Sequence, residues 1–337
     1  FIINALCDTI KTNYSIIEKS TALGNATYIA SNSVDNGGNI GWNLNASIAR
    51  TLYWVGGSGN WSDAQHWSLT SGGVGGECMP TLHDDVFFDI NSGFATNNIV
   101  TIDIPTAYCK SMDWTGALNS PTFTGNQGTN ANLHIHGSLT FIQNMTYQFG
   151  GNVRFLSTSG GNTVTTGHQH FSKNTIFQGT GGSWLLQDSL STTLFELVEG
   201  DFYSNGNSIR AGNFYANTNS LTIDTLDLFH SNIYMYLNDS RFEIIGDTSN
   251  SSVNNQRWLR TDLDSTNFYY THTGTNNRYL DLALIDTANI GEVIFSPNIT
   301  NHLSYYGYKD QIEGNGTIYI KKVIMNKQGT ITRSVYG

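Results

Sequence analysis

The stretch Leu133-His-Ile-His-Gly-Ser-Leu-Thr-Phe-Ile142, closely followed by Gly150-Gly-Asn-Val-Arg-Phe-Leu156, alternates apolar with polar residues between glycine breaks. A period of two predicts short β-strands that bury one face. The same pattern returns further along the chain, and amphipathic helical periodicity is nearly absent. The chain is therefore predicted to be all-β, with further strands expected near 175–177, 184–186, 221–223, 233–236 and 242–245.

The turns between these segments favour a β-solenoid over a β-sandwich. They are rich in asparagine and glycine, as in Asn205-Gly206, and recur at close, uneven spacing, while the whole chain has only 4 prolines. In a parallel β-solenoid each coil pairs its backbone with the next coil, and the corners need small residues or residues that tolerate a left-handed backbone. We therefore expect a parallel β-helix whose Val, Ile, Leu and Phe side chains point inward.

Composition points to an extracellular protein. Only 12% of the 337 residues are charged, compared with about 25% in typical globular proteins, so Asn, Ser and Thr supply much of the polar surface. The net charge of −10 disfavours nucleic acid as a partner. No stretch approaches the roughly 20 apolar residues of a membrane span. Because it starts at Phe1, the chain is expected to belong to a longer protein whose targeting signals lie elsewhere.

One segment, residues 53–89, departs from this pattern because it is rich in tryptophan and glycine. Its tryptophans are Trp54, Trp61 and Trp67. We expect their rings to cover one end of a hydrophobic column, with glycines such as Gly56 and Gly57 letting the backbone turn tightly against them. The segment is predicted to be a structural joint between two solenoid modules.

The same segment resembles a known protein family. The run Trp54-Val-Gly-Gly-Ser-Gly-Asn-Trp-Ser-Asp63, then His66-Trp-Ser68, Cys78-Met-Pro80 and Asp84-Asp-Val-Phe-Phe-Asp89, is similar to the recurring module of very large cell-surface adhesins of gliding and biofilm-forming Bacteroidota, which are exported by the type IX secretion system. Residues 30–42 look like the closing coil of a preceding module, whereas beyond Trp114 the match is in style only. The resemblance implies a right-handed parallel β-helix repeated many times, and it carries over no catalytic residues.

We therefore predict three regions. Residues 1–50 are the final coils of a preceding solenoid module, residues 51–95 are the joint or cap, and residues 96–337 are a new solenoid that continues beyond the chain. Neighbouring modules of the same chain are expected to be its structural partners.

Two kinds of bound or bonded site are candidates near the joint. Asp84, Asp85 and Asp89 follow a glycine-rich loop, and carboxylate oxygens are ligands that calcium prefers; the alternative is that they cap turns. Calcium is the only cofactor that the sequence suggests. Cys78 and Cys109 are predicted to form a disulfide in an exported chain, and the alternative is two buried thiols that never meet.

Histidine pairs and scattered charges raise the alternative of chemistry on the solenoid surface. His134 with His136, and His168 with His170, share a strand face and are candidate metal chelators, but without a third ligand a structural role is preferred. A β-helix polysaccharide lyase, a glycoside hydrolase or a tailspike-like sugar binder is the alternative function. Its candidate charged residues are Asp201, Asp224, Asp227, Arg210 and Arg257.

Two further patterns concern glycans. Triplets of Asp, then Ser or Thr, then an apolar residue look like acceptors for bacterial O-linked glycans, and their hydroxyl residues are Thr9, Ser189, Thr225 and Thr287. Tyrosines on outer faces can stack on sugars, and the candidates are Tyr234, Tyr236, Tyr269, Tyr270, Tyr305 and Tyr306. Because one residue of each adjacent pair must face inward on a strand, a core role is the preferred alternative. Together these features predict a non-catalytic segment of a secreted cell-surface adhesin or filament that attaches to glycans, abiotic surfaces or other cells, with a role in gliding motility.

Overall fold

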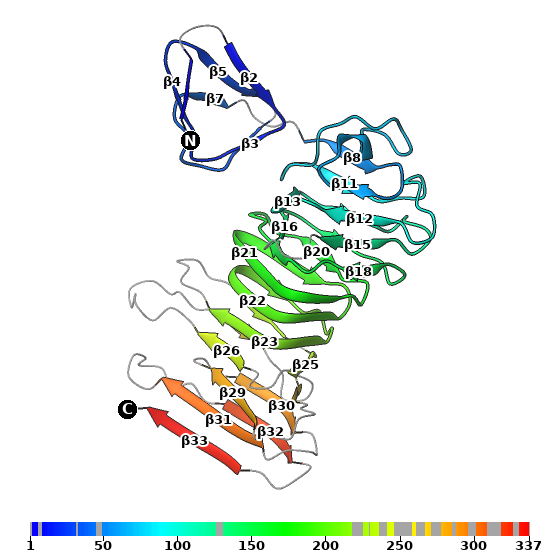
Figure 1. The fold of residues 1–337 in the computed structure, drawn as a ribbon. Coiled ribbons are helices and arrows are strands. Elements are labelled where there is room, and N and C mark those ends of the chain that lie inside the picture. The colour runs from blue at the N-terminus through cyan, green and yellow to red at the C-terminus, as the bar shows by residue number, and fades with distance from the viewer. Residues whose placement is uncertain are drawn as a thin grey trace. The chain divides into compact units, whose positions relative to one another are not determined.

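The computed structural model describes residues 2–5, 9–31, 33–44, 49–125, 131–216, 225–228 and 230–235 with their side chains, and only the backbone of Asn217 and of the later strands. The chain divides into two compact units. The first contains residues 1–136 and 144–146, and the second contains residues 137–143 and 147–337. Both units are built from short strands that pair in parallel (Figure 1). The predicted all-β parallel β-solenoid is confirmed.

The first unit begins with a small set of N-terminal coils. Strands far apart in the sequence lie opposite each other in parallel register, so that Thr9 pairs with Thr27 and Ile16 with Val34. Tyr28 and Ala30 are buried between these coils. Strand β1 (Ile2–Asn4) pairs with β4 (Thr21–Leu23), and β3 (Ile16–Ile17) pairs with β6 (Val34–Asp35). Strand β5 (Thr27–Ser31) lies between β2 (Thr9–Asn13) and β7 (Trp42–Leu44) and pairs with both.

The tryptophan-rich segment forms the next coils of the first unit. Its strand β8 (Thr51–Trp54) pairs in parallel with β11 (Asp85–Phe87), and β11 pairs in parallel with β14 (Met112–Asp113). The parallel ladder therefore already begins at residue 51, inside the segment predicted as a separate joint. The other strands here are β9 (Gly59–Asn60), β12 (Ile99–Ile102), β13 (Thr106–Cys109), β15 (Thr122–Gly125) and β16 (Asn132–Ile135).

A short strand lies along β8. Strand β10 (Trp67–Ser68), which follows the 3-10 turn η1 (Ala64–His66), pairs with β8 in the antiparallel sense, with Trp67 opposite Trp54. An unpaired strand edge is a template for further pairing. Since β11 pairs with one edge of β8, β10 occupies the other. In the first unit β10 therefore covers one edge of β8, and the role of the segment as a joint between modules stays a prediction.

The second unit continues the parallel pattern with longer strands. Strands β21 (His170–Leu186), β22 (Leu190–Tyr203) and β23 (Ile209–Asn217) pair in parallel, with register shifts along the β21–β22 pairing. The others are β17 (Leu139–Thr140), β19 (Asn152–Phe155), β20 (Asn162–Thr165), β24 (Thr225–Asp227), β25 (Asn232–Met235), β26 (Arg241–Ile245), β27 (Trp258–Arg260), β28 (Asn267–Tyr270), β29 (Arg278–Leu284), β30 (Ala288–Phe295), β31 (Asn301–Tyr308), β32 (Ile318–Met325) and β33 (Thr330–Tyr336); β18 (Thr146–Gln148) has residues in both units.

Inward side chains of the second unit stack from one coil to the next. Phe155 stacks on Phe177 with ring centroids 4.7 Å apart, and Phe195 stacks on Phe214 at 4.2 Å. All four rings are fully buried. Because the coils are in register, every inward position meets a similar position above and below it, and the alternating sequence produces a continuous aromatic column.

Outward positions carry uncharged polar side chains in the same register. In the first unit, Asn60 lies opposite Thr101, and Thr101 lies opposite Thr124. Such side chains align on neighbouring strands without the like-charge repulsion that Asp or Lys at the same positions would cause. The low content of charged residues thus has a direct explanation in the stacking of coils.

The corner at Gly200 shows how tightly successive coils approach. Gly200 has a φ of +95°, and a Cβ there would lie 2.8 Å from the carbonyl oxygens of Gly179 and Gly182 and 2.9 Å from the ring of Trp184. Replacing Gly200 by alanine is expected to lower the free energy of unfolding by about 1–3 kcal/mol, because the backbone strain and the collision act together. The measurement is urea denaturation followed by circular dichroism.

Gly161 is the matched control for Gly200. Its φ is +83°, but a Cβ there would meet no atom within 4 Å. Gly161→Ala therefore introduces the strain without the collision, and we expect a smaller loss of stability than for Gly200→Ala. Equal losses in the two variants would contradict the close contact between coils at the Gly200 corner.

Candidate functional site

The three predicted tryptophans form a sealed aromatic cluster. Trp54, Trp61 and Trp67 are fully buried, and Trp67 contacts the other two edge to face, with centroid distances of 5.1 Å to Trp54 and 4.9 Å to Trp61. Their indole nitrogens are partly used for backbone contacts, since Trp67 Nε1 donates to the Trp61 carbonyl oxygen at 2.8 Å. Phe88 and Trp114 extend the cluster as a stacked pair at 3.7 Å. The cluster is a structural core and not a surface for a ligand.

The glycines of the cluster have the expected backbone role. Gly56 and Gly57 have φ values of +84° and +75°. The Gly57 carbonyl accepts a hydrogen bond from Trp54 Nε1 at 2.7 Å, and a Cβ on Gly57 would lie 2.6 Å from the side chain of Asn98. The left-handed backbone and the close approach explain why glycine stands here.

Asp84 belongs to a buried ion pair. Its two carboxylate oxygens accept hydrogen bonds from Arg50 Nη2 at 2.7 Å and Arg50 Nε at 3.1 Å, and its side chain is 1% exposed. Thr81 contributes its backbone N–H and its hydroxyl, both at 2.8 Å. Burial alone raises the pKa of the Asp84 carboxyl, but the hydrogen bonds from Arg50 and Thr81, with the Arg50 charge, outweigh it and hold the pKa below its ordinary value.

Arg50 ties several segments of the first unit together. Its guanidinium donates to the carbonyl oxygens of Cys78 and Met79, each at 3.2 Å, in addition to Asp84. The same group lies 3.9 Å from the ring centroid of Tyr14, a residue of the N-terminal coils. This network could not be predicted from the sequence, because its members are separated by long stretches of chain and no spacing rule relates them.

The three predicted calcium ligands have other partners in the structure, and calcium binding stays a prediction. Asp84 forms an ion pair with Arg50, and Asp85 forms one with Lys110 Nζ at 3.3 Å. Asp89 accepts a hydrogen bond from Asn91 N at 2.8 Å. Within the described residues no three Asp, Glu, His or Cys side chains come together as a metal site. Alternation along β11 separates the side chains of Asp84 and Asp85, and the turn-capping alternative describes Asp89 correctly.

Cys78 and Cys109 are not bonded to each other in the structure, and the disulfide stays a prediction. Cys78 and Cys109 are both free, with Cys78 exposed in the loop before β11 and Cys109 buried on β13. Burial raises the pKa of the Cys109 thiol, and the Asp85 and Asp84 charges act in the same direction. The alternation of β13 points Cys109 into the core, which is why it does not reach a loop residue. Cys7 lies outside the described residues.

The histidine pairs do not converge on a metal site within the described residues. His134 on β16 contacts Tyr108 on β13 edge to face, with ring centroids 5.1 Å apart. Burial and the nearby His83 lower the pKa of His136 to about 4. In the second unit, His170 Nδ1 lies 2.8 Å from Ser191 Oγ, while His168 occupies a turn with a φ of +59°. The structural role preferred from the sequence stays a prediction for these residues.

The candidate residues for sugar chemistry are scattered. Asp201 Oδ1 accepts a hydrogen bond from Thr225 N at 2.6 Å. Asp227 lies opposite Tyr203, and Arg210 lies opposite Ser191. Asp224, Arg257 and Tyr236 lie outside the described residues, and only the backbone is described for Tyr269, Tyr270, Tyr305 and Tyr306. Tyr234 is half-buried on β25. A catalytic use of these charged residues stays a prediction.

Three of the four candidate glycan acceptors are described. Thr9 is exposed on β2, whereas Ser189 and Thr225 are half-buried. Thr225 additionally donates its backbone N–H to Asp201, and the Ser189 carbonyl accepts from Thr166 Oγ1. Thr287 lies outside the described residues. Modification of any of them stays a prediction, with Thr9 the most accessible of the three.

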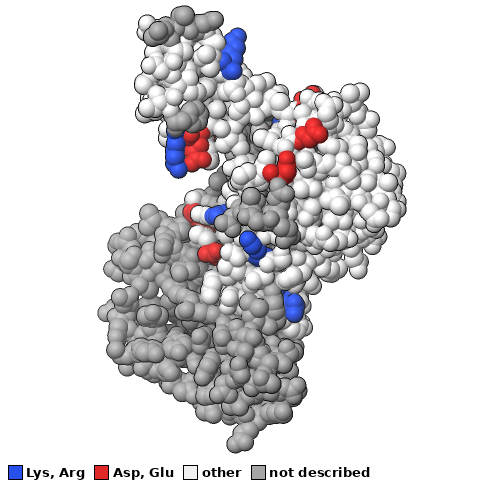
Figure 2. Space-filling view, viewed as in Figure 1, with Lys and Arg blue, Asp and Glu red and all other residues white. Residues whose placement is uncertain are grey.

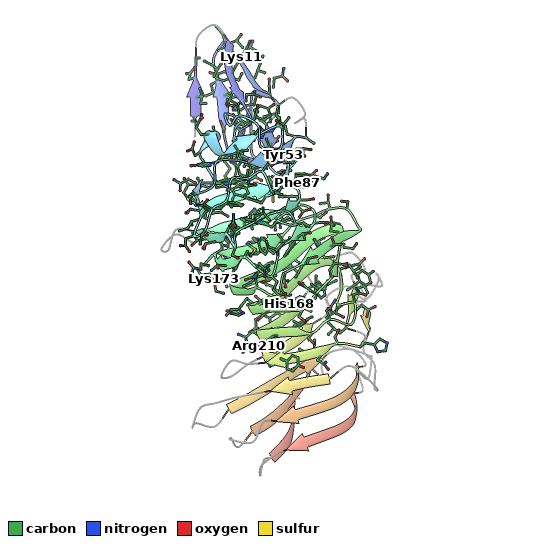
Figure 3. All side chains as sticks on the ribbon, turned by 90° about the vertical axis from the view of Figure 1, so that its right-hand side faces the viewer. Lys11, Tyr53, Phe87, His168, Lys173 and Arg210 are labelled. Atoms are coloured by element: carbon green, nitrogen blue, oxygen red, sulfur yellow. The ribbon has the colours of Figure 1, made fainter. Side chains whose placement is uncertain are left out.

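An outward aromatic pair lies on the sheet of the first unit. Tyr53 on β8 and Phe87 on β11 are opposite each other in parallel register, and their rings stack with centroids 5.5 Å apart and planes 27° apart. Figure 3 shows the two residues on successive coils. Both are half-buried. The buried neighbours Leu52, Trp54, Val86 and Phe88 leave the intervening positions pointing outward, so alternation was the signal that sequence reasoning could have used to find the pair.

Two carboxylates flank the aromatic pair. Asp113 on β14 lies opposite Phe87, and Asp85, two positions before Phe87 on β11, pairs with Lys110. Asp113 Oδ1 accepts a hydrogen bond from Thr115 N at 2.7 Å, and a carboxylate can accept further bonds. We call the surface of Tyr53, Phe87, Asp85 and Asp113 the aromatic platform. Charged side chains are sparse on the face that Figure 2 shows.

The described part of the chain contains no helix with the length and apolar character of a membrane span. Comparisons with protein-family models, curated proteins and solved structures find no match to this chain.

Proposed function

We propose that the chain is a non-catalytic, rigid segment of a secreted cell-surface adhesin or filament, and that its outer faces attach to glycans. The observation that carries this proposal is the aromatic platform: Tyr53 stacked on Phe87, with Asp85 and Asp113 beside them, on the outside of a parallel sheet.

The chemistry of the platform suits a sugar ring. Aromatic rings offer flat apolar surface to the C–H face of a pyranose, and carboxylates accept hydrogen bonds from its hydroxyl groups. The two rings cost little conformational entropy on binding because each is held by a strand and by its stacked neighbour. A platform of this size supports weak binding, so attachment would require many copies acting together.

The scaffold suits a load-bearing segment. Parallel ladders and stacked phenylalanines give each coil a direct contact with the next one, as in Phe195 on Phe214. Cell-surface location, type IX export, a role in gliding motility and attachment to neighbouring modules are part of the proposal. They rest on the resemblance of residues 54–89 to the adhesin module, together with the scarcity of charged residues.

The proposal is tested by displaying the full 337-residue chain on beads and measuring retention on immobilised neutral and acidic polysaccharides. Tyr53→Thr with Phe87→Thr removes the rings and keeps residues that suit a strand. We expect the double variant to lower bead retention by about tenfold, because loss at each weak site multiplies across the many copies on a bead.

The matched control is Tyr215→Thr, which removes a half-buried tyrosine from β23 in the second unit. Beads that carry Tyr215→Thr are expected to be retained on polysaccharide as well as beads that carry the unchanged chain. Both variants should have the circular dichroism spectrum of the unchanged chain. Two results would contradict the proposal: no retention of the unchanged chain on any polysaccharide, or release of new reducing ends from a soluble polysaccharide, which would identify an enzyme.

A further inference from the structure

A pocket of about 270 Å³ lies in the first compact unit, where the N-terminal coils meet the coils that follow residue 49. Tyr14 and Ser15 belong to the N-terminal coils, Met79 and Thr81 to the loop before β11, and Thr106 and Tyr108 to β13. The remaining lining residues are apolar. The volume is just under the range of about 300–1,000 Å³ that is usual for small-ligand sites, so it accommodates a single ring.

Tyr14 is held in the pocket wall in a strained conformation. Its φ is +48°, a region that residues with a Cβ seldom occupy. The Arg50 guanidinium lies 3.9 Å from the ring centroid, and Asp84 fixes that guanidinium in turn. Strain of this kind persists where surrounding contacts hold it, and it gathers at ligand sites.

Tyr108 and its neighbours provide the polar groups of the pocket. Burial raises the pKa of the Tyr108 hydroxyl, the Glu18 charge adds to this, and a hydrogen bond with Thr106 opposes it. Tyr108 is consequently a neutral hydroxyl that both donates and accepts. The hydroxyls of Ser15, Thr81 and Thr106 also line the pocket, so the described lining contains hydroxyls and aromatic rings but no Asp, Glu, Lys, Arg or His.

From this lining we infer that the pocket binds one neutral sugar ring, seated between Tyr14 and Tyr108. Aromatic walls suit the C–H faces of a pyranose, and hydroxyls pair with its hydroxyls. Among the described residues, the pocket lining has no charged side chain, and the Arg50 guanidinium against Tyr14 is already paired with Asp84. A charged sugar would therefore lose its hydration without gaining a partner of opposite charge, which disfavours acidic and amino sugars. The inference rests on the proposed glycan binding and assigns a second site, distinct from the aromatic platform, to the same unit.

A bound ring would also contact both parts of the first unit. Tyr14 and Ser15 are on the N-terminal coils, whereas Thr81 and Tyr108 are on the coils after residue 49. A ligand that binds only the assembled arrangement stabilises it by mass action. Sugar binding would therefore raise the thermal midpoint of the first unit.

The experiment is isothermal titration of the full chain, backed by saturation-transfer NMR, with D-glucose, D-galactose and N-acetyl-D-glucosamine as probes. D-Glucuronic acid and D-glucosamine are the charged comparators. We expect saturable binding of at least one neutral sugar, with each charged sugar at least about tenfold weaker. Tyr108→Ala should weaken the neutral sugar by about tenfold or more, and Tyr108→Phe, which keeps the ring, should weaken it less.

Tyr215→Ala in the second unit is the control variant, and thermal melting confirms that each variant folds. Three results would overturn the inference: no saturable neutral-sugar binding up to about 10 mM, equal affinity for charged sugars, or an unchanged affinity in Tyr108→Ala. If any of these results occurs while retention of the protein-coated beads on polysaccharide still depends on Tyr53 and Phe87, the pocket inference is wrong and the proposed function stands. If free sugar binds in a way that depends on Tyr108 but the beads are not retained on polysaccharide, the pocket is supported and glycan attachment through the aromatic platform is contradicted.

Discussion

Replacing Asp84 by asparagine is expected to lower the free energy of unfolding of the first unit by about 3–5 kcal/mol, the usual loss when one partner of a buried ion pair is removed. The Arg50 guanidinium would stay buried, with a side chain only 4% exposed, and would lose its closer charged partner, leaving Glu77 Oε2 at 3.8 Å from Arg50 Nη1. The asparagine amide also cannot accept hydrogen bonds on both of its terminal atoms, as Asp84 does from Arg50 and Thr81. Urea denaturation followed by tryptophan fluorescence measures the loss.

The neighbouring pair of Asp85 and Lys110 is the control. Their side chains are 29% and 51% exposed, and Asp85→Asn is expected to cost no more than about 1 kcal/mol because water screens the pair. If Asp84→Asn and Asp85→Asn cost the same, the Asp84 network does not stabilise the fold in the way that its buried contacts indicate.

Acid titration gives a second test of the same carboxylate. Because the pKa of Asp84 is lowered in the folded state, its contribution is present above the ordinary pKa of about 3.9 and is lost as the pH falls through the folded value. His136 acts in a higher pH range, because its pKa is about 4 in the folded state and about 6.5 in the unfolded state. As the pH falls from about 6.5 to 4, the unfolded chain takes up a proton on His136 that the folded chain does not, and the free energy of unfolding decreases. In Asp84→Asn, the loss below pH 4 should become shallower while the loss above pH 4 remains.

Replacing Trp67 by alanine is expected to cost about 3–5 kcal/mol, the range for a fully buried aromatic side chain. Trp67 contacts Trp54, Trp61 and Phe88, and no part of it is exposed. The substitution would leave a cavity in the aromatic cluster and remove the hydrogen bond from Trp67 Nε1 to the Trp61 carbonyl. Thermal melting and urea denaturation of the full chain provide the measurement.

Leu69 provides the matched comparison two residues further along. Its side chain is 51% exposed, so Leu69→Ala should change the free energy of unfolding by no more than about 0.5 kcal/mol. A similar loss for Trp67→Ala and Leu69→Ala would mean that the cluster contributes little to stability, and the structural role of the tryptophan-rich segment would then be wrong.

The contacts of Asp84 and Cys109 could not be read from the sequence for one common reason. Asp84 and Cys109 were assigned partners on the basis of their residue types, but their surroundings depend on which way each side chain points. Asp84 meets Arg50 from the start of another strand, and Cys109 faces the core on β13. Local spacing contains no information about contacts across 34 positions, such as that between Arg50 and Asp84.

Features that depend on neighbours along the chain could be predicted from the amino-acid sequence. Alternation over residues 133–156 predicted the strands, the glycines predicted the corners, and the shortage of charge predicted surfaces that stack in register. The outward position of Tyr53 between Leu52 and Trp54 was also readable, because side chains of a strand alternate between faces. Only the tertiary structure decided that Tyr53 stacks on Phe87, that Arg50 neutralises Asp84, and that Tyr14 and Tyr108 line one pocket. These contacts join different coils, and their geometry arises when the coils stack.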